Sequence, residues 1–299
     1  MTGSSTKSPE RTAAMDRAKL DGAELEYRVA GSGEPVLLVP PGPLADSFLP
    51  FSSEEALLDR YSLILYHRRG MVGSSNVTPP VSFAEQAADA AGLLDHLGIG
   101  RAHVVGHSTG ATIALQLALD RPEVVQSLAL LEPPLTASPS AAAFFEQAAP
   151  SIEAYGSGDK KTAMAAFLSL VSGLEWETCR AVIDDHFPGA TTQAIKDADT
   201  FFGVDLPALN AWEFGSEDAA AIAQPILSVL GTESERWFVE GAQLLRSWFP
   251  HVEGLTVDGV GHLLHAQRPE PVARGIAEFL GRHPITADRT RISRSTRLR

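Results

Sequence analysis

A serine between two glycines is the strongest chemical signal in this chain, in the run Gly106-His107-Ser108-Thr109-Gly110. The run follows a short apolar segment typical of a strand and precedes apolar residues at helical spacing. On such a tight strand-to-helix turn, small flanking residues avoid steric conflict, and the free amides of the helix favour a developing anion. We therefore predict that Ser108 is a nucleophile and that the amide of Thr109 stabilises an oxyanion.

A serine hydroxyl is a weak nucleophile unless a base takes its proton, and a histidine near the C-terminus is the candidate for this base. His262 follows the last predicted strand, at 255–257, as the chain order of nucleophile, acid and base requires. His265 in the same loop is the alternative. His67 is assigned to loop architecture and His107 to the turn of the nucleophile. We predict that His262 is the base.

The carboxylate that would orient the base is left open between three glutamates. Glu132 directly follows the predicted strand 127–131, one helix and one strand beyond the nucleophile, so it should emerge at the same edge of the sheet. A carboxylate at the end of an apolar strand is costly to bury without a partner, which favours Glu132 as part of a functional pair. Glu233 and Glu235, after the strand at 226–230, are the alternatives. The acid would accept a hydrogen bond from the base, select its tautomer and stabilise the imidazolium.

Strands and helices that would position these residues alternate along most of the chain, which predicts a parallel sheet covered on both faces. The predicted strands lie at 24–30, 35–40, 61–66, 101–105, 127–131, 226–230 and 255–257. The predicted helices lie at 83–97, 109–119 and 271–281.

The domain organisation follows from where this alternation holds. Residues 18–133 and 222–284 form the predicted core, and 134–221, where no strand pattern is found, form a predicted helical cap. Helices of this insertion are expected at 140–155, 159–173, 175–186 and 191–202. An insertion between two strands usually shapes a binding site. Residues 1–17 are predicted to be a disordered tail, and 285–299 a basic, solvated tail.

Four motifs together resemble those of the α/β-hydrolase superfamily, over roughly residues 19–283. They are VPPG at 39–42, YHRRGMVGSS at 66–75, GHSTG at 106–110 and DGVGH at 258–262. The resemblance implies the α/β-hydrolase fold, a mostly parallel eight-stranded sheet flanked by helices with a helical cap. It also implies a serine hydrolase that uses a catalytic triad. The motifs are specific for the fold and not for a substrate.

Two features depart from the common pattern of this superfamily. Most members have an aspartate where Ser234 stands, but zearalenone lactonases are similar in placing a glutamate at the position of Glu132. Most members also have His-Gly-x in the turn that gives the second oxyanion donor, whereas this chain has Pro40-Pro41-Gly42-Pro43. Because proline has no N–H, only Gly42 can donate, and the zearalenone lactonases have a similar turn. The resemblance therefore implies Gly42 as the second donor.

The predicted pocket is apolar. Aromatic residues are frequent in the insertion, and most are expected to form its core. Trp212, Phe214 and Leu263 are the predicted substrate contacts. The expected substrate is a small, uncharged and largely apolar ester or lactone, because no arginine cluster indicates a carboxylate or phosphate.

Two other functions remain open on the same residues. A triad of this type can cleave an activated C–C bond or form peracids, and some members of the superfamily are small-molecule receptors with little turnover. A serine nucleophile argues against dehalogenase or epoxide hydrolase chemistry, which the superfamily performs with an aspartate.

The composition limits the partners and the location of the protein. The chain has 299 residues and a formal net charge of −13, so neither nucleic acid nor an anionic membrane is an expected partner. No signal-like or membrane-spanning apolar run is found, so a cytoplasmic location is expected. Cys179 is the single cysteine and cannot form an intramolecular disulfide. No residues have metal-ligand spacing, so no metal and no cofactor are expected. The sequence leaves the oligomeric state open.

Overall fold

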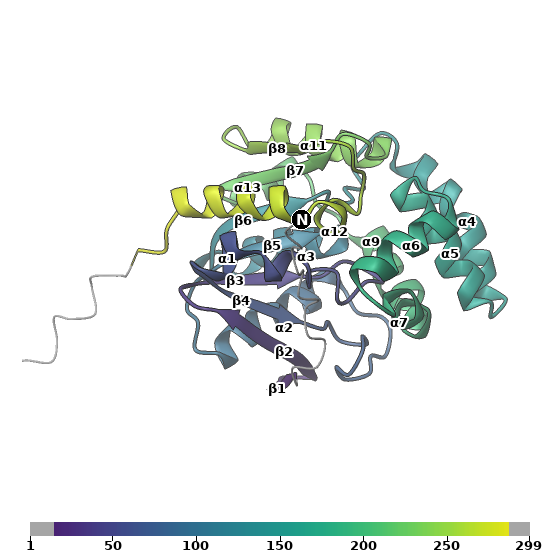
Figure 1. Ribbon diagram of the computed structural model, residues 1–299, viewed down its shortest axis with the longest axis horizontal. Coiled ribbons are helices and arrows are strands. Elements are labelled where there is room, and N and C mark those ends of the chain that lie inside the picture. Colours follow the sequence, from purple (N-terminus) through teal and green to yellow (C-terminus); the bar gives the residue numbers. More distant parts are fainter. Residues whose placement is uncertain (1–14, 287–299) are drawn as a thin grey trace, which may run out of the picture.

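A computed structural model describes residues 15–286 of the chain (Figure 1). Its centre is an eight-stranded sheet in the order β1-β2-β4-β3-β5-β6-β7-β8. The first two pairings, β1 with β2 and β2 with β4, are antiparallel, and all the others are parallel. The strands are β1 (Asp16–Leu20), β2 (Ala23–Gly31), β3 (Glu34–Val39), β4 (Tyr61–Tyr66), β5 (Ala102–His107), β6 (Val125–Leu131), β7 (Ile226–Gly231) and β8 (Glu253–Val257). The predicted fold class is confirmed.

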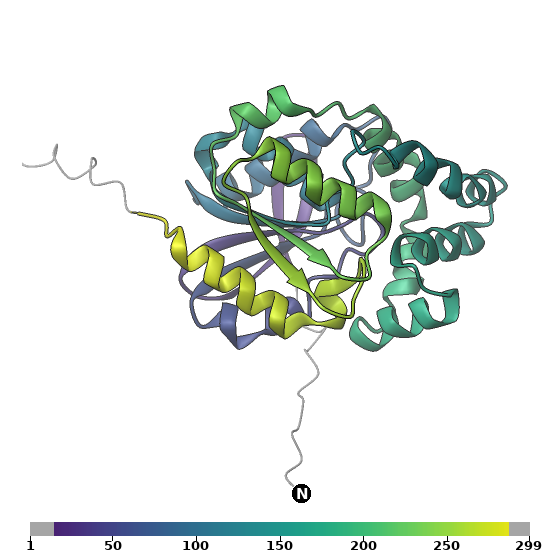
Figure 2. The same cartoon turned by 90° about the horizontal axis from the view of Figure 1, so that it is seen from above.

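Helices cover both faces of the sheet (Figure 2). One face is covered by α2 (Phe83–His96), α3 (Thr109–Asp120) and α11 (Arg236–Trp248), and the other by α1 (Glu55–Leu58) and α13 (Pro269–Arg282). Alternate residues of a strand pack against the two helical layers. In β3, Leu37 packs in the core on the side of α2 and α3, and Val36 and Leu38 pack in the core on the side of α1 and α13. Parallel strands buried on both sides therefore read as continuous apolar runs.

The structure adds several elements to the sequence-based prediction, among them strand β1 and helix α11, and corrects one boundary. Strand β1 begins at Asp16, so Asp16 and Arg17 pair with Tyr27 and Glu26 and do not belong to the predicted tail. The sequence pattern of β1 is short and half exposed, which leaves little periodicity to detect. Helix α11 was not predicted, although a crossover between the parallel strands β7 and β8 requires such an element. The rest of the predicted tails, 1–14 and 287–299, lies outside the described residues.

Between β6 and β7 the chain forms a group of helices beside the sheet, shown in teal and green in Figure 1. They are α4 (Ala141–Gly156), α5 (Lys160–Ser172), α6 (Trp176–His186), α7 (Ala190–Lys196), α8 (Ala198–Thr200), the π-helical turn η3 (Phe201–Asp205), α9 (Leu206–Ala211) and α10 (Ser216–Ala221). The predicted helices at 140–155, 159–173 and 175–186 match α4, α5 and α6 closely. The predicted helix at 191–202 is divided into α7, α8 and the start of η3. We call residues 134–221 the helical insertion.

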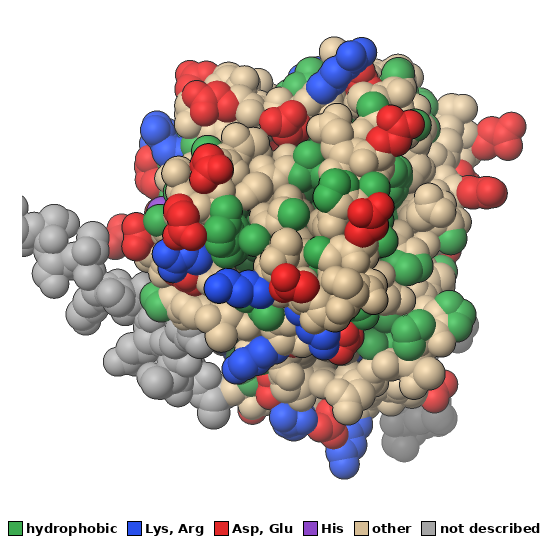
Figure 3. All heavy atoms as spheres, turned by 90° about the vertical axis from the view of Figure 1, so that its right-hand side faces the viewer, with side chains coloured by type: hydrophobic (Ala, Val, Ile, Leu, Met, Phe, Trp, Pro, Cys, Tyr) green, Lys and Arg blue, Asp and Glu red, His purple; other side chains and the backbone are tan. Residues whose placement is uncertain are grey.

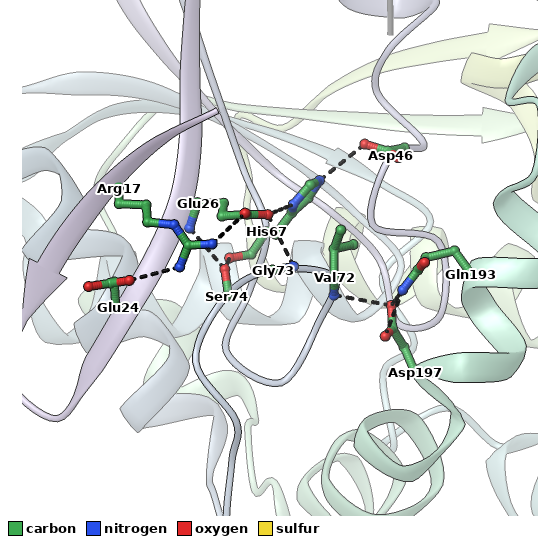
Figure 4. A network of polar contacts seen from close by, with 10 residues as sticks. All are labelled: Arg17, Glu24, Glu26, Asp46, His67, Val72, Gly73, Ser74, Gln193 and Asp197. Atoms are coloured by element: carbon green, nitrogen blue, oxygen red, sulfur yellow. Dashed lines mark hydrogen bonds and ion pairs between the residues drawn. The ribbon is translucent and has the colours of Figure 1, made fainter. Parts of the chain in front are cut away.

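His67 anchors the loop that follows β4 (Figure 4). Its Nδ1 lies 3.1 Å from Glu26 of β2, and its Nε2 lies 3.1 Å from Asp46. Glu26 also accepts a hydrogen bond from the backbone N–H of Gly73, and Arg17 pairs with the same carboxylate. With a carboxylate at each ring nitrogen, His67 joins three segments of the chain, which agrees with its assignment to loop architecture.

The same loop is tied to the helical insertion. The backbone N–H of Val72 donates to Asp197 Oδ2 at 3.3 Å, and Gln193 of α7 holds both oxygens of that carboxylate. The hydroxyl of Thr200 donates to the carbonyl of Gly70 at 2.6 Å. Figure 4 shows the Val72, Gln193 and Asp197 contacts beside the His67 network. These hydrogen bonds attach the loop after β4, and with it the sheet, to the helical insertion.

We expect the stability of the protein to depend on pH through His67. Burial of the ring opposes its protonation, but the hydrogen bonds and charges of Asp46 and Glu26 outweigh it and raise the pKa of His67 above 6.5. A raised folded-state pKa means that the stabilisation is complete below the unfolded value and is lost as the pH rises through the folded value. Urea unfolding of the wild type and of His67→Gln, from about pH 6 to pH 9, measures this difference.

The free energy of unfolding of the wild type should fall more steeply over that range than that of His67→Gln. Other titrating groups are common to both proteins and cancel in the difference. Parallel pH profiles for the two proteins would show that His67 carries no charge-dependent stabilisation.

Candidate active site

Ser108 stands on a strained turn between β5 and α3. Its φ of 53° and ψ of −128° lie in a region that L-residues rarely adopt. Its N–H donates to the carbonyl of Leu131 at 2.9 Å, which ties the turn to the neighbouring strand β6. Such strain is kept only where the surroundings impose it, and it is typical of catalytic positions.

The two glycines of the motif are required by backbone contacts. A Cβ at Gly106 would lie 2.4 Å from the carbonyl oxygen of Gly110, and one at Gly110 would lie 2.2 Å from the carbonyl oxygen of Val39. Neither backbone can move aside without displacing a strand or the helix. Glycine therefore lets the start of α3 lie directly against the end of β3.

Glu132 follows β6 as Ser108 follows β5, and these two strands are paired in parallel. Its Oε2 lies 2.8 Å from Nδ1 of His262, and both side chains are buried. Its Oε1 accepts hydrogen bonds from the N–H of Gly231, at 2.9 Å, and from the hydroxyl of Ser234. The structure thus brings Glu132 to the predicted base.

The alternative acids lie elsewhere. Glu233 and Glu235 are both exposed, and the carboxylate of Glu235 lies near Gly173 of the insertion. Ser234, which stands where most of the superfamily has its aspartate, instead supports Glu132 from the end of β7.

The rings of three histidines and one phenylalanine pack together beside the turn that carries Ser108. The ring of His262 stacks on Phe238 at 3.9 Å and 11°. His107 donates from Nε2 to the carbonyl of His262 at 2.9 Å, and its ring lies against that of His265. Burial, followed by the neighbouring histidine charges, lowers the pKa of His107 well below its ordinary value. The same causes lower the pKa of His265 to about 3, so the alternative base is a very weak one.

Gly42 and Thr109 lie next to each other at the mouth of the turn. A Cβ on Gly42 would be 3.6 Å from Thr109 Oγ1 and 2.6 Å from the ring of Phe201. Both residues line one pocket together with Ser108 and His262. The structure therefore gathers the predicted nucleophile, base and oxyanion donors around a single cavity, with Glu132 behind the base.

The wall of this pocket is largely apolar. The apolar side chains come from the turn after β3, from the helical insertion, from the start of α11 and from the loop after β8. They are Pro41, Pro43, Leu44, Pro134, Phe144, Phe167, Leu168, Val171, Phe201, Leu206, Leu209, Trp237, Phe238 and Leu263. Within the described part of the chain, the lining includes no acid, lysine or arginine. Leu263 is thus at the pocket, as expected of a substrate contact.

The prediction for Trp212 and Phe214 is wrong as to place, because neither lines this pocket. Their rings stack on each other at 4.9 Å, and Trp212 also contacts Phe83 of α2. The indole N–H of Trp212 donates to Gln116 of α3 at 2.8 Å, which draws the ring towards the outer helices. Aromatic content alone does not tell which way a side chain faces. Phe144, Phe201 and Trp237 take the places at the pocket.

The sheet order and the nucleophile turn define the class of α/β hydrolases. Residues 35–269 match the family described as alpha/beta hydrolase fold. The chain belongs to this family, and it is a hydrolase.

The chain is similar to several proteins that are named as hydrolases. The chain is 30% identical over 267 residues to a protein of Azorhizobium caulinodans named "Putative carbamate hydrolase RutD", covering 87% of this chain and 96% of that protein. It superimposes on a thermophilic esterase from Thermogutta terrifontis with a TM-score of 0.77 and 21% identity, over 90% of this chain and 100% of the other. The enol-lactonase from Burkholderia xenovorans LB400 gives a TM-score of 0.74 and 19% identity, over 89% and 100%. At this identity, the structural matches show the fold alone.

Among residues 15–286, none of the helices has the length and apolar character needed to cross a bilayer. Over the same residues, histidine, cysteine, aspartate and glutamate side chains do not come together in groups of three or more that would hold a metal ion.

We expect Gly110→Ala to destabilise the protein by at least about 2 kcal/mol, because the new methyl group would overlap the carbonyl of Val39. Gly100→Ala is the matched control, since a Cβ there meets nothing within 4 Å, and its effect should stay within about 0.5 kcal/mol. Urea unfolding of the three proteins checks both values. Equal midpoints for Gly110→Ala and the wild type would contradict the assigned contact.

Proposed function

We propose that this protein is a serine hydrolase that cleaves a carboxylic ester or lactone of a small, largely apolar substrate through an acyl-enzyme. Ser108 is the nucleophile, His262 the base and Glu132 the acid. The observation that carries the proposal is the contact of 2.8 Å between Glu132 and His262 Nδ1 at the pocket that Ser108 lines. An acid at Nδ1 leaves Nε2 as the nitrogen that exchanges a proton with the serine.

In the proposed reaction, Ser108 Oγ attacks the acyl carbon while its proton passes to His262 Nε2. Glu132 stabilises the imidazolium, and the amides of Gly42 and Thr109 donate to the oxyanion. The C–O bond to the leaving alcohol then breaks, and His262 returns the proton to that oxygen. Water, deprotonated by the same histidine, attacks the acyl-enzyme and releases the carboxylic acid and free Ser108.

The lining of the pocket supports an uncharged substrate. A carboxylate or ammonium placed against phenylalanine, leucine and valine side chains would lose its hydration without gaining a partner. The face of the molecule seen in Figure 3 carries both acidic and basic side chains, so the preference for an uncharged substrate rests on the pocket lining and not on this surface. The helical insertion acts as a cap that supplies more than half of the apolar side chains of this lining and so shapes the specificity.

The names of the similar proteins are compatible with this chemistry. Esters, enol-lactones and carbamates, named for the two solved structures and for the RutD relative, all react through an attacked carbonyl carbon. The apolar wall of this pocket favours an ester or lactone over a small polar carbamate.

We expect Ser108→Ala to abolish hydrolysis of p-nitrophenyl esters from acetate to decanoate and of an aromatic lactone. Glu132→Gln should lower kcat/KM by about three to four orders of magnitude, because an amide no longer holds the base in the required tautomer and charge state. Glu233→Gln is the matched control, since Glu233 is exposed, and it should retain the wild-type rate.

Labelling with a fluorophosphonate reports the nucleophile independently of the substrate. An unlabelled, folded wild type that cleaves none of these compounds would contradict the hydrolytic proposal and favour a receptor. Equal losses in Glu132→Gln and Glu233→Gln would contradict the assigned acid.

The charge preference of the pocket is tested by two esters of equal acyl length. p-Nitrophenyl butyrate should be cleaved with a kcat/KM about a hundredfold higher than p-nitrophenyl hemisuccinate, because the second must bury a carboxylate without a partner. Steady-state kinetics at constant ionic strength provide the ratio. A ratio near one would show that the acyl chain does not enter the apolar pocket.

A further inference from the structure

We propose that Arg68 is the positioning residue for the oxyanion donor Gly42: it holds the peptide that carries this amide and aims its N–H at the pocket. The proposal rests on the proposed function, because it assigns the amide of Gly42 to the oxyanion. It concerns a side chain that takes no part in proton transfer and does not line the pocket.

The guanidinium of Arg68 lies directly behind the turn after β3. Its Nη2 donates to the carbonyl oxygen of Pro41 at 3.0 Å and to that of Gly42 at 3.1 Å. The side chain is buried, with 2% of its surface exposed. A cation hidden from water in this way must find its partners within the protein, and the two carbonyls are among them.

Because the peptide bond is planar, the contact of Arg68 with a carbonyl oxygen also sets the direction of the N–H of the same peptide. The peptide between Pro41 and Gly42 is trans, so the C=O of Pro41 and the N–H of Gly42 point to opposite sides of one plane. Fixing the carbonyl oxygen on Arg68 therefore fixes the N–H of Gly42 on the other side. A charge-assisted hydrogen bond to the oxygen also polarises the amide and strengthens it as a donor.

The prolines explain why a side chain is needed for this purpose. In the run Pro40-Pro41-Gly42-Pro43, only Gly42 has an N–H, and that donor is reserved for the oxyanion. The turn has no other backbone donor with which to fix itself. It is held through its carbonyl oxygens instead, and Arg68 presents donors to two of them.

Asp205 holds the arginine in place from the other side. Both of its carboxylate oxygens lie 2.8 Å from Arg68 nitrogens, and Gln86 Nε2 donates to the same carboxylate at 3.2 Å. Asp205 belongs to η3, whose first residue, Phe201, lies against Gly42 and lines the pocket. One buried ion pair thus secures the oxyanion turn and the wall of the pocket that faces it.

The test separates positioning from folding. In the double variant Arg68→Met/Asp205→Leu, apolar side chains replace the whole ion pair, which leaves no unpaired charge in the core. We expect a folded protein whose kcat for a p-nitrophenyl ester falls about tenfold to a hundredfold, with KM within about twofold. The inhibition constant of a boronic acid, which forms a tetrahedral adduct with the serine, should rise by the same factor.

The neighbouring pair Arg69 and Asp89 is the matched control. Arg69 Nε and Nη2 lie 2.5 and 2.6 Å from the two oxygens of Asp89, so this pair is also bidentate and largely buried. Arg69→Met/Asp89→Leu should keep the wild-type kcat and the wild-type affinity for the boronic acid. A loss of kcat in this control equal to that in the Arg68 variant would overturn the proposal.

Two milder variants keep the proposal testable where the double variant does not fold. Asp205→Asn leaves Arg68 at the turn and should keep kcat within about threefold, whereas Arg68→Lys loses the planar fork that reaches both carbonyls and should lower it more. Equal effects of these two variants on kcat, or an unchanged kcat in a folded double variant, would overturn the proposed role of Arg68. Neither result would contradict the proposed hydrolase function. Absence of ester hydrolysis in the wild type would instead overturn the proposed function and, with it, this inference.

Discussion

The contact between the start of α3 and the end of β3 is the steric constraint on which the candidate site depends. It leaves no room for a side chain at Gly110, where a Cβ would lie 2.2 Å from the carbonyl oxygen of Val39. At the same junction Thr109 lies beside Gly42, and Ser108, directly before α3, has a positive φ. The strain is balanced by the rest of the sheet, because the N–H of Ser108 is held by Leu131 of the adjacent strand.

Buried charge is the second organising feature. Each buried carboxylate near the site is surrounded by hydrogen-bond donors. Glu132 and Asp205 are both buried carboxylates, and each accepts hydrogen bonds from segments distant in the sequence. A buried carboxylate is stable only where such donors converge on it. Glu132 therefore joins β6, β7 and the loop that carries His262. Asp205 joins the loop after β4 to the helical insertion. The same donors that satisfy these charges also orient the groups that face the pocket.

Between these polar anchors lies an apolar cavity, and this contrast matters for catalysis. Hydrogen bonds to a developing oxyanion are worth more in a dry, low-dielectric site than in water, provided that the donors are already in place. The fold is shared with hydrolases of several specificities, so the sheet does not decide the substrate. The lining side chains decide it, and more than half of the apolar ones come from the insertion.

The sequence by itself predicted the sheet, its flanking helices and the nucleophile turn, because these depend on local periodicity and on glycines at fixed spacing. For the acid it favoured Glu132 over Glu233 and Glu235, and tertiary structure places Glu132 against His262 while Glu233 and Glu235 face solvent. Tertiary structure also moved Trp212 and Phe214 away from the pocket and placed Arg68 behind the oxyanion turn. Such contacts join residues far apart in the chain, and their partners depend on how helices are rotated against a sheet. Local patterns carry no information about that rotation, so only the folded chain decides which side chains meet.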